Sequence, residues 1–176
     1  MIPQIKKILY ATDLTKNSVY AFFYAVDMAK KNKASIVILH SIEPVSYVYD
    51  EGGDDVQSVL KKAKKQEQER NIEEIKRRIQ EFCNRTEIQI DSSCIELVSK
   101  IIVSFGYPVE EILKTADDEG CDAIILGTHG KGFLRQTFLG RVTGSVLERT
   151  RKPVFIIPLP SDKMKIDWDK ISAMSG

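Results

Sequence analysis

Four glycines in one stretch of the sequence have spacings that suit a phosphate-binding loop. An apolar run, Ala123 to Leu126, is followed by glycines at Gly127, Gly130, Gly132 and Gly140. Glycine leaves backbone amides open to close approach. The start of a following helix offers unpaired N–H groups and a positive dipole end to an anion. The pattern suits a phosphate site, although glycines alone fit an ordinary strand-to-helix loop at least as well.

The other reactive side chains show no pattern of a metal site or a catalytic triad. Cys83, Cys94 and Cys121 are an odd number without a CxxC pair, and none has metal-ligand spacing to His40 or His129. We interpret the cysteines as reduced and structural, and His40 as a packed or hydrogen-bonded core residue. For His129, in the glycine loop, contact with phosphate and exposure to solvent both stay open.

The composition is typical of a single soluble globular domain. The chain has 176 residues, of which 43% are apolar and 29% charged. Its 26 Lys and Arg residues nearly balance 25 Asp and Glu residues, so no basic field is available for nucleic acid. The apolar run at the start of the sequence is too short for a signal peptide, and no apolar run has the ~18 residues of a membrane span. We therefore expect a cytoplasmic protein that binds neither nucleic acid nor membrane.

Apolar segments alternate with helical patterns along the chain and predict an open, doubly wound α/β sheet. Five strands are predicted, at residues 5–11, 34–40, 101–104, 122–126 and 153–158. Four helices are predicted, at residues 15–32, 56–83, 108–120 and 141–152. Nearly continuous apolar runs suit parallel strands covered on both faces.

Three segments have other expected characters. Residues 44–55, with two adjacent glycines and four acids, are interpreted as a surface loop. Residues 85–100 fit either an early start of the third strand or a short insertion before it. A domain is expected over residues 1–160, with a polar tail over residues 161–176 that is frayed rather than docked.

Ligands of such sheets bind at the carboxyl ends of the strands, where the strand order reverses. If the first and fourth strands are neighbours there, Thr12 and Asp13 face the loop from Gly127 to Gly130 across a crevice. The glycine loop would then be one wall of a ligand site.

The motifs resemble those of the universal stress protein family. That family's signature is Gly-x2-Gly-x9-Gly followed by Ser or Thr, and Gly127, Gly130 and Gly140 have these spacings. Residues 7–13, 38–40, 106–112 and 152–154 resemble other family segments. The resemblance covers roughly residues 5–158, except residues 85–100. It implies a five-stranded parallel sheet of the Rossmann-like, adenine nucleotide alpha-hydrolase-like type, with strand order 3-2-1-4-5.

The resemblance also implies a site for ATP, AMP or adenosine, with or without Mg²⁺ (magnesium). Adenine would lie against Ala11 and Ser41, and Asp13 would contact the nucleoside. The residues around the glycine loop would take the ribose and phosphates. The candidate site residues are Ala11, Asp13, Ser41, Leu126, Gly127, His129, Gly130, Gly140, Arg141 and Val142.

Arg141 departs from the family pattern, in which Ser or Thr follows the third glycine in members that bind ATP. Its guanidinium would either clamp the phosphate or fill the place of the phosphate. A cation at a helix N-terminus is unfavourable by roughly 0.3–1 kcal/mol unless an anion is near. Gly144-Ser145 repeats the missing Gly-Ser pair one helical turn later.

Three functions stay open. The first is a nucleotide-binding regulatory protein of the stress response that acts through dimer or partner contacts. The second is an enzyme, at most a slow ATPase, because the chain lacks the Ser-Gly-Gly-x-Asp-Ser and His-x-Gly-His motifs of related enzymes. The third is a nucleotide-free interaction module in which Arg141 closes the phosphate site.

The last predicted strand bears on assembly. Val154 to Ile157 is an apolar segment with a proline at each end, which fits the edge of a sheet. Apolar edges have to be covered or paired, and members of the resembled family commonly form dimers there. We expect a homodimer with the two last strands antiparallel.

Overall fold

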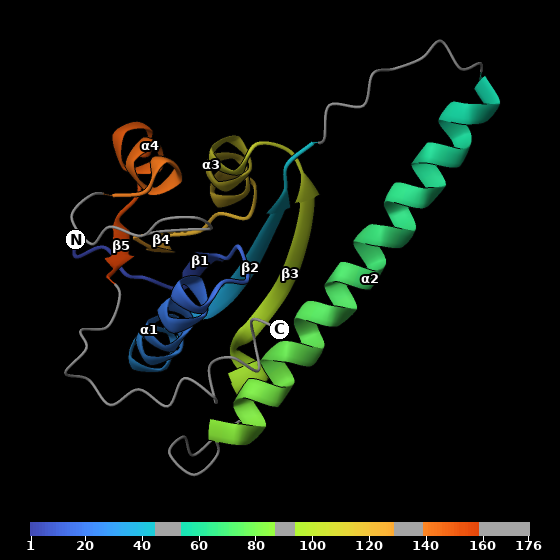
Figure 1. Ribbon diagram of the computed structural model, residues 1–176. Coiled ribbons are helices and arrows are strands. Elements are labelled where there is room, and N and C mark those ends of the chain that lie inside the picture. Colours follow the sequence, from blue (N-terminus) through green and yellow to red (C-terminus); the bar gives the residue numbers. More distant parts are fainter. Residues whose placement is uncertain (45–53, 87–93, 129–138, 159–176) are drawn as a thin grey trace.

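The structure, a computed structural model, describes residues 1–44, 54–86, 94–128 and 139–158. Its centre is a sheet of five strands that are all parallel. The strands are β1 (Lys7–Ala11), β2 (Ser35–Ile42), β3 (Val98–Phe105), β4 (Ala123–Gly127) and β5 (Val154–Ile157). They lie in the order β3-β2-β1-β4-β5, which confirms the expected doubly wound fold (Figure 1).

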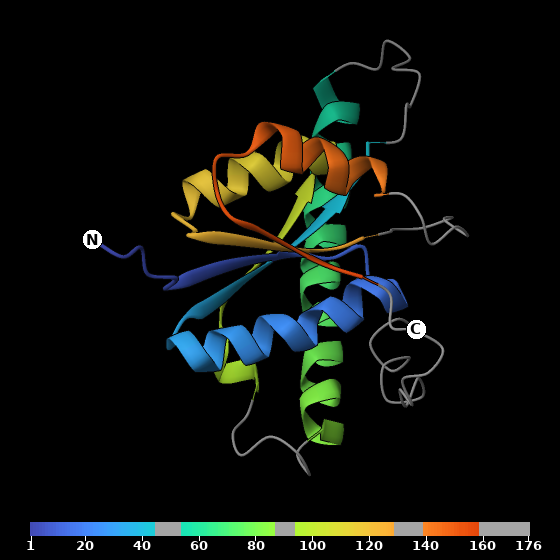
Figure 2. The same cartoon turned by 90° about the vertical axis from the view of Figure 1, so that its left-hand side faces the viewer.

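Helices cover both faces of the sheet (Figure 2). They are α1 (Lys16–Asn32), α2 (Asp54–Thr86), α3 (Pro108–Asp118) and α4 (Arg141–Arg149), with a 3-10 helix, η1 (Cys94–Leu97), before β3. Alternate residues of β1 face opposite ways: Ile8 and Tyr10 join one core cluster with Phe22 of α1, and Leu9 joins another with Ile112 of α3. The strands are apolar on both faces because both faces are covered.

α1 lies close against the sheet because a row of alanines runs along its buried face. Ala21, Ala25 and Ala29 are fully buried, at the four-residue spacing of the predicted helix. The helix ends at Lys33, whose φ of 52° is left-handed. This end turns the chain directly into β2.

α2 packs at only one end. Its 33 residues span about 50 Å, whereas the eight residues of β3 span about 26 Å. Ile75 and Ile79 are buried against the core, whereas Val56, Val59 and Leu60 are 51%, 64% and 46% exposed. The first half of α2 therefore projects past the sheet (Figure 1).

β3 and β5 are the two edges of the sheet. β3 begins at Val98, three residues before the predicted strand, and η1 precedes it directly. Residues 87–93 lie outside the described part, so an insertion before the strand stays open. The side-chain amide of Gln68 on α2 donates to the carbonyl of Val103. That contact satisfies a backbone acceptor of β3 and helps to cover this edge strand.

Candidate functional site

A pocket of about 610 Å³ opens at the carboxyl ends of β1, β2 and β4, where the strand order reverses. This is the volume range of small-molecule sites. Eight of the ten predicted residues line it: Ala11, Asp13, Ser41, Leu126, Gly127, Gly140, Arg141 and Val142. The other two, His129 and Gly130, lie outside the described residues.

Side-chain hydrogen bonds fix the loop that follows β1. The Asp13 Oδ1 atom accepts from the Thr15 backbone N–H at 3.0 Å and from the Thr15 hydroxyl at 2.6 Å. The Thr12 and Ser18 hydroxyl oxygens are 2.9 Å apart, and the Leu14 N–H donates to Thr12 Oγ1 at 3.0 Å. Leu14 has a left-handed φ of 63°, a conformation that these neighbours hold in place. The Asp13 carboxylate is thus preorganised at the wall of the pocket.

The end of β2 is tied to its neighbours on both sides. His40 donates from Nδ1 to the Thr12 carbonyl oxygen at 2.9 Å, and Ser41 Oγ donates to the Gly106 carbonyl at 2.8 Å. His40 is therefore a hydrogen-bonded residue, as expected. Because the Ser41 hydroxyl proton is used in this bond, its oxygen faces a ligand as an acceptor.

The end of β4 is joined to the start of α4. The Thr143 hydroxyl donates to the Gly127 carbonyl at 2.8 Å, and the Gly140 N–H donates to the Thr128 carbonyl at 2.7 Å. Gly140 is the N-cap of α4, as the sequence predicts, and its turn has no side-chain cap within the described chain. The first N–H groups of α4 are thus in a position to receive an anion.

Arg141 stands at the mouth of the pocket. Its Nη2 atom is 3.9 Å from Oε1 of Glu43, which follows β2 on the opposite side. The side chains are 84% and 55% exposed. The guanidinium thus lies largely in solvent.

Sequence reasoning missed Glu43 and the wall that Pro108 and Ile112 of α3 contribute. The two α3 residues lie four apart, on one face of a helix. The motif of residues 106–112 was therefore the signal for this wall. Glu43 has no comparable signal, because a single carboxylate after a strand is a common surface feature.

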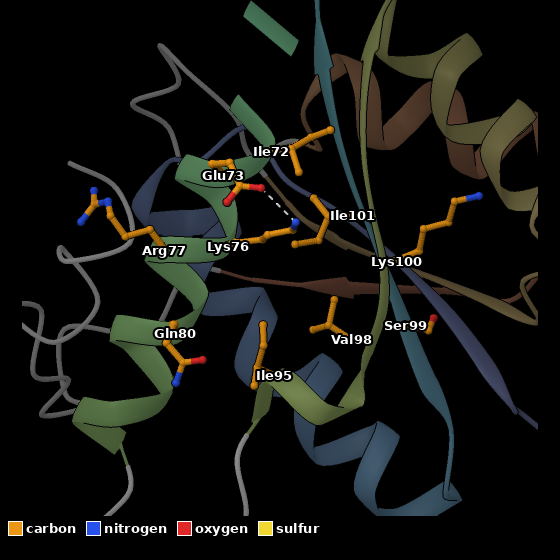
Figure 3. A pocket seen from close by; sticks show the side chains of 10 residues that line it. All are labelled: Ile72, Glu73, Lys76, Arg77, Gln80, Ile95, Val98, Ser99, Lys100 and Ile101. Carbon is orange, nitrogen blue, oxygen red and sulfur yellow. Dashed lines mark hydrogen bonds and ion pairs between the residues drawn. The ribbon is translucent and has the colours of Figure 1, made fainter. Parts of the chain in front are cut away.

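A second pocket, of about 660 Å³, lies between α2 and β3 (Figure 3). Ile72, Ile95, Val98 and Ile101 line it together with charged side chains, and Lys76 pairs with Glu73 at 3.0 Å. It contains none of the candidate residues. The described chain has no cluster of His, Cys, Asp and Glu suited to a metal ion.

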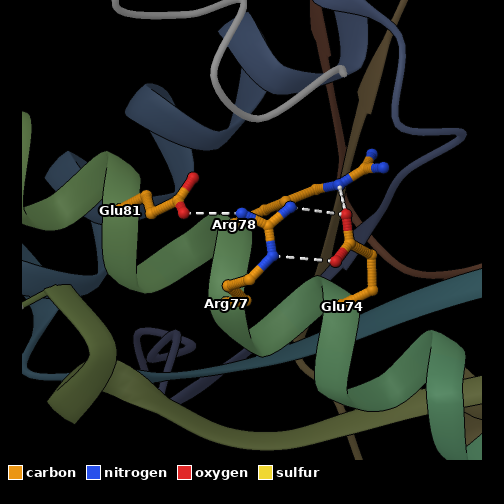
Figure 4. A network of polar contacts seen from close by, with 4 residues as sticks. All are labelled: Glu74, Arg77, Arg78 and Glu81. Carbon is orange, nitrogen blue, oxygen red and sulfur yellow. Dashed lines mark hydrogen bonds and ion pairs between the residues drawn. The ribbon is translucent and has the colours of Figure 1, made fainter.

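The perturbed ionisable groups lie away from the pocket mouth. Arg77 and then Arg78 hydrogen-bond Glu74 and lower the pKa of its carboxyl to about 2, in an ion-pair network on α2 (Figure 4). Desolvation raises the pKa of Cys121 to about 11. Cys94 and Cys121 are buried thiols, whereas nothing is described of the Cys83 side chain. These groups are structural rather than poised for chemistry.

No helix in the described ranges combines the length and apolar character that crossing a membrane requires.

Burial also changes the pKa of Tyr10, beneath the pocket. Its hydroxyl donates to the Ser18 carbonyl at 2.6 Å, and desolvation raises its pKa well above the usual range. Tyr10 therefore stays uncharged, and its hydrogen bond to Ser18 holds the start of α1 in place.

Sequence comparisons agree with this arrangement. A profile of the universal stress protein family matches residues 4–158. Universal stress protein MJ0577 of Methanocaldococcus jannaschii is 28% identical over 165 aligned positions, covering 86% of this chain and 94% of that protein. Universal stress protein YxiE of Bacillus subtilis is 27% identical over 161 positions, covering 86% and 97%.

Solved structures share the fold. The structure of MJ0577 has a TM-score of 0.60 at 26% identity and covers 91% of this chain and 100% of that one. UspA from Lactobacillus plantarum has a TM-score of 0.62 at 21% identity, covering 89% and 99%. A universal stress protein in complex with cAMP has a TM-score of 0.52 at 17% identity, covering 88% and 98%. Since the profile spans most of the chain and the sheet order agrees, the chain belongs to the universal stress protein family.

Proposed function

We propose that this protein binds an adenine nucleotide in the pocket at the strand-order reversal, and acts in the cytoplasm as a stress-response regulator. One observation carries the proposal: eight residues chosen from motifs far apart in the sequence line a single pocket. The solved complex with cAMP described above is of another protein, and at 17% identity it supports the fold alone. The case for a nucleotide therefore rests on this chain's own residues.

The pocket offers a different partner to each part of a nucleotide. Ala11 and Ser41 provide a small apolar contact and a hydroxyl acceptor for the base. Asp13 is an acceptor for ribose hydroxyls. The uncapped N-terminus of α4 and the guanidinium of Arg141 suit a phosphate. A magnesium ion is not required by any of these contacts.

The exposure of Arg141 favours a binding protein over a module with a closed phosphate site. A side chain that is 84% exposed leaves the pocket open, and it is free to swing onto an anion. Binding without turnover is proposed, since the sequence lacks the Ser-Gly-Gly-x-Asp-Ser and His-x-Gly-His motifs of related enzymes.

Calorimetric titration with ATP, AMP and adenosine, with and without Mg²⁺, tests the proposal. Gly130→Val places a branched side chain in the glycine signature and is expected to abolish binding. Gly144→Ala is the matched control, because a Cβ there meets no described atom within 4 Å. Absence of heat with the wild-type protein would refute nucleotide binding, and phosphate release over hours would show turnover.

A further inference from the structure

The hydroxyl of Ser104, near the end of β3, is buried and has no hydrogen-bond partner in the described part of the chain. Hydroxyls in protein interiors are nearly always hydrogen-bonded, because burying one without a partner costs folding free energy. Stability therefore does not explain a serine at this position, and a role in the bound state is the alternative to consider.

Ser104 lies directly beside Ser41, the proposed contact for the base. The two serines are partners in the parallel register of β2 and β3, so their side chains point to the same face of the sheet. Ile102, two residues before Ser104, packs on this face in one cluster with Ile112 of α3, which lines the pocket. Because β2 separates β3 from β1 and β4, Ser41 lies between Ser104 and the pocket.

The Gly106 carbonyl is the acceptor that ties Ser41 down. The Ser41 hydroxyl donates to it at 2.8 Å, so Ser41 offers a ligand only an acceptor. If Ser41 turned its proton to a ligand, this carbonyl would lose its side-chain donor. Ser104 lies two residues before Gly106 and opposite Ser41 in the register, so rotation about its χ1 can supply a replacement.

We infer that Ser104 is a reserve donor that lets Ser41 switch from acceptor to donor when a nucleotide binds. In the bound state the Ser104 hydroxyl donates to the Gly106 carbonyl, and Ser41 donates to an acceptor nitrogen of the purine ring. Ser104 is thus a positioning residue that acts through Ser41. This role depends on the proposed nucleotide site and specifies how that site binds the base.

Calorimetric titration of Ser104→Ala with AMP and with adenosine tests the inference. The variant is expected to bind both ligands about five- to tenfold more weakly, the effect of one lost hydrogen bond. The two losses should be equal, because the phosphate takes no part. In urea denaturation of the free protein, the midpoint should stay unchanged or rise, since no hydrogen bond is lost there.

Ser99→Ala is the matched control on the same strand. The Ser99 hydroxyl donates to the Ile36 carbonyl at 3.2 Å, and neither residue lines the pocket. Its removal should lower the urea midpoint and leave both affinities unchanged.

A double-mutant cycle shows whether Ser104 acts through Ser41. In a Ser41→Ala background, Ser104→Ala should change the affinity for AMP by less than about twofold, because the switch no longer exists.

Unchanged affinities in Ser104→Ala, or an equal loss with and without Ser41, overturn the inference and leave the proposed function standing. So does a lower urea midpoint, which would show that the hydroxyl is already bonded in the free protein. Binding of neither ligand by the folded wild-type protein refutes the proposed function, and the role of Ser104 with it. Far-ultraviolet circular dichroism of each variant confirms that the fold is intact.

Discussion

At the scale of single residues, Thr143 joins the glycine loop to α4. It is 5% exposed, and its hydroxyl donates to the Gly127 carbonyl at 2.8 Å. Thr143→Val keeps the shape but leaves that carbonyl without this donor, so we expect a loss of about 1–2 kcal/mol in the free energy of unfolding. Urea denaturation measures it. AMP affinity should fall as well, because the wall of the pocket loosens.

Thr143→Ser is the control for this prediction, since it keeps the hydroxyl and removes only a methyl group. It should retain nucleotide affinity. Equal losses of affinity in the serine and valine variants would mean that packing, and not the hydrogen bond, positions α4.

Eight of the ten candidate residues line one pocket, so much of its lining could be predicted from the sequence. Gly127 is the last residue of β4 and Asp13 lies two residues after β1, at the strand ends where a parallel sheet collects ligand-binding residues, and Gly140 begins α4 beside them. Glu43 was not predictable, because its role depends on a distance across the pocket to Arg141. No spacing along the chain encodes that distance.

At the scale of elements, the end of α1 is strained at one residue. Lys33 is exposed and left-handed, with φ 52° and ψ 46°. Side chains with a Cβ are disfavoured there by about 1 kcal/mol. Lys33→Gly should therefore raise the free energy of unfolding by about 0.5–1 kcal/mol in urea denaturation.

The same substitution two residues earlier should have the opposite effect. Lys31 lies in the last turn of α1 and pairs with Asp27 at 2.7 Å. Lys31→Gly is expected to cost about 1 kcal/mol, because glycine is a poor helix former. A destabilising effect at both positions would show that the entropy that glycine adds to the unfolded chain outweighs the relief of the left-handed cap.

α2 divides into a packed half and a projecting half, and mutations should report the boundary. Ile75 is 2% exposed, and Ile75→Ala is expected to cost about 2–5 kcal/mol of unfolding free energy. Leu60 is 46% exposed, and Leu60→Ala should stay within about 0.5 kcal/mol. Urea denaturation of both variants makes the comparison. A large loss for Leu60→Ala would show that the projecting half is covered in solution.

The start of β3 marks the limit of sequence reasoning about elements. Ser99 and Lys100 interrupt its apolar run, so the surer pattern began only at Ile101. Both residues are exposed because β3 is an edge strand. Polar residues are favoured at such positions since they discourage pairing with other chains. For α2, the sequence pattern predicted that a helix forms, but not which of its ends packs against the sheet.

At the scale of the whole molecule, the two edges of the sheet differ in how they are protected. The β3 edge carries Lys100 and the contact of Gln68 with Val103. On β5, Val154, Phe155 and Ile156 are only partly buried. An apolar edge strand is a template for pairing with another chain. We propose that β5 pairs antiparallel with β5 of a second copy, which makes the protein a homodimer.

Ile156→Lys should convert this dimer into a monomer. Ile156 is partly exposed on the edge strand, so a lysine can be solvated in the monomer but would place an unpaired charge in the dimer interface. Light scattering at micromolar concentration should give twice the chain mass of 19.9 kDa for the wild-type protein and a single chain mass for the variant. Ser99→Lys adds the same charge to the opposite edge and should leave the dimer unchanged.

Because the proposed nucleotide pocket is lined within one chain, monomeric Ile156→Lys is expected to keep its affinity for AMP. A monomeric wild-type protein would exclude pairing through β5, and a dimeric Ile156→Lys variant would move the interface to another surface.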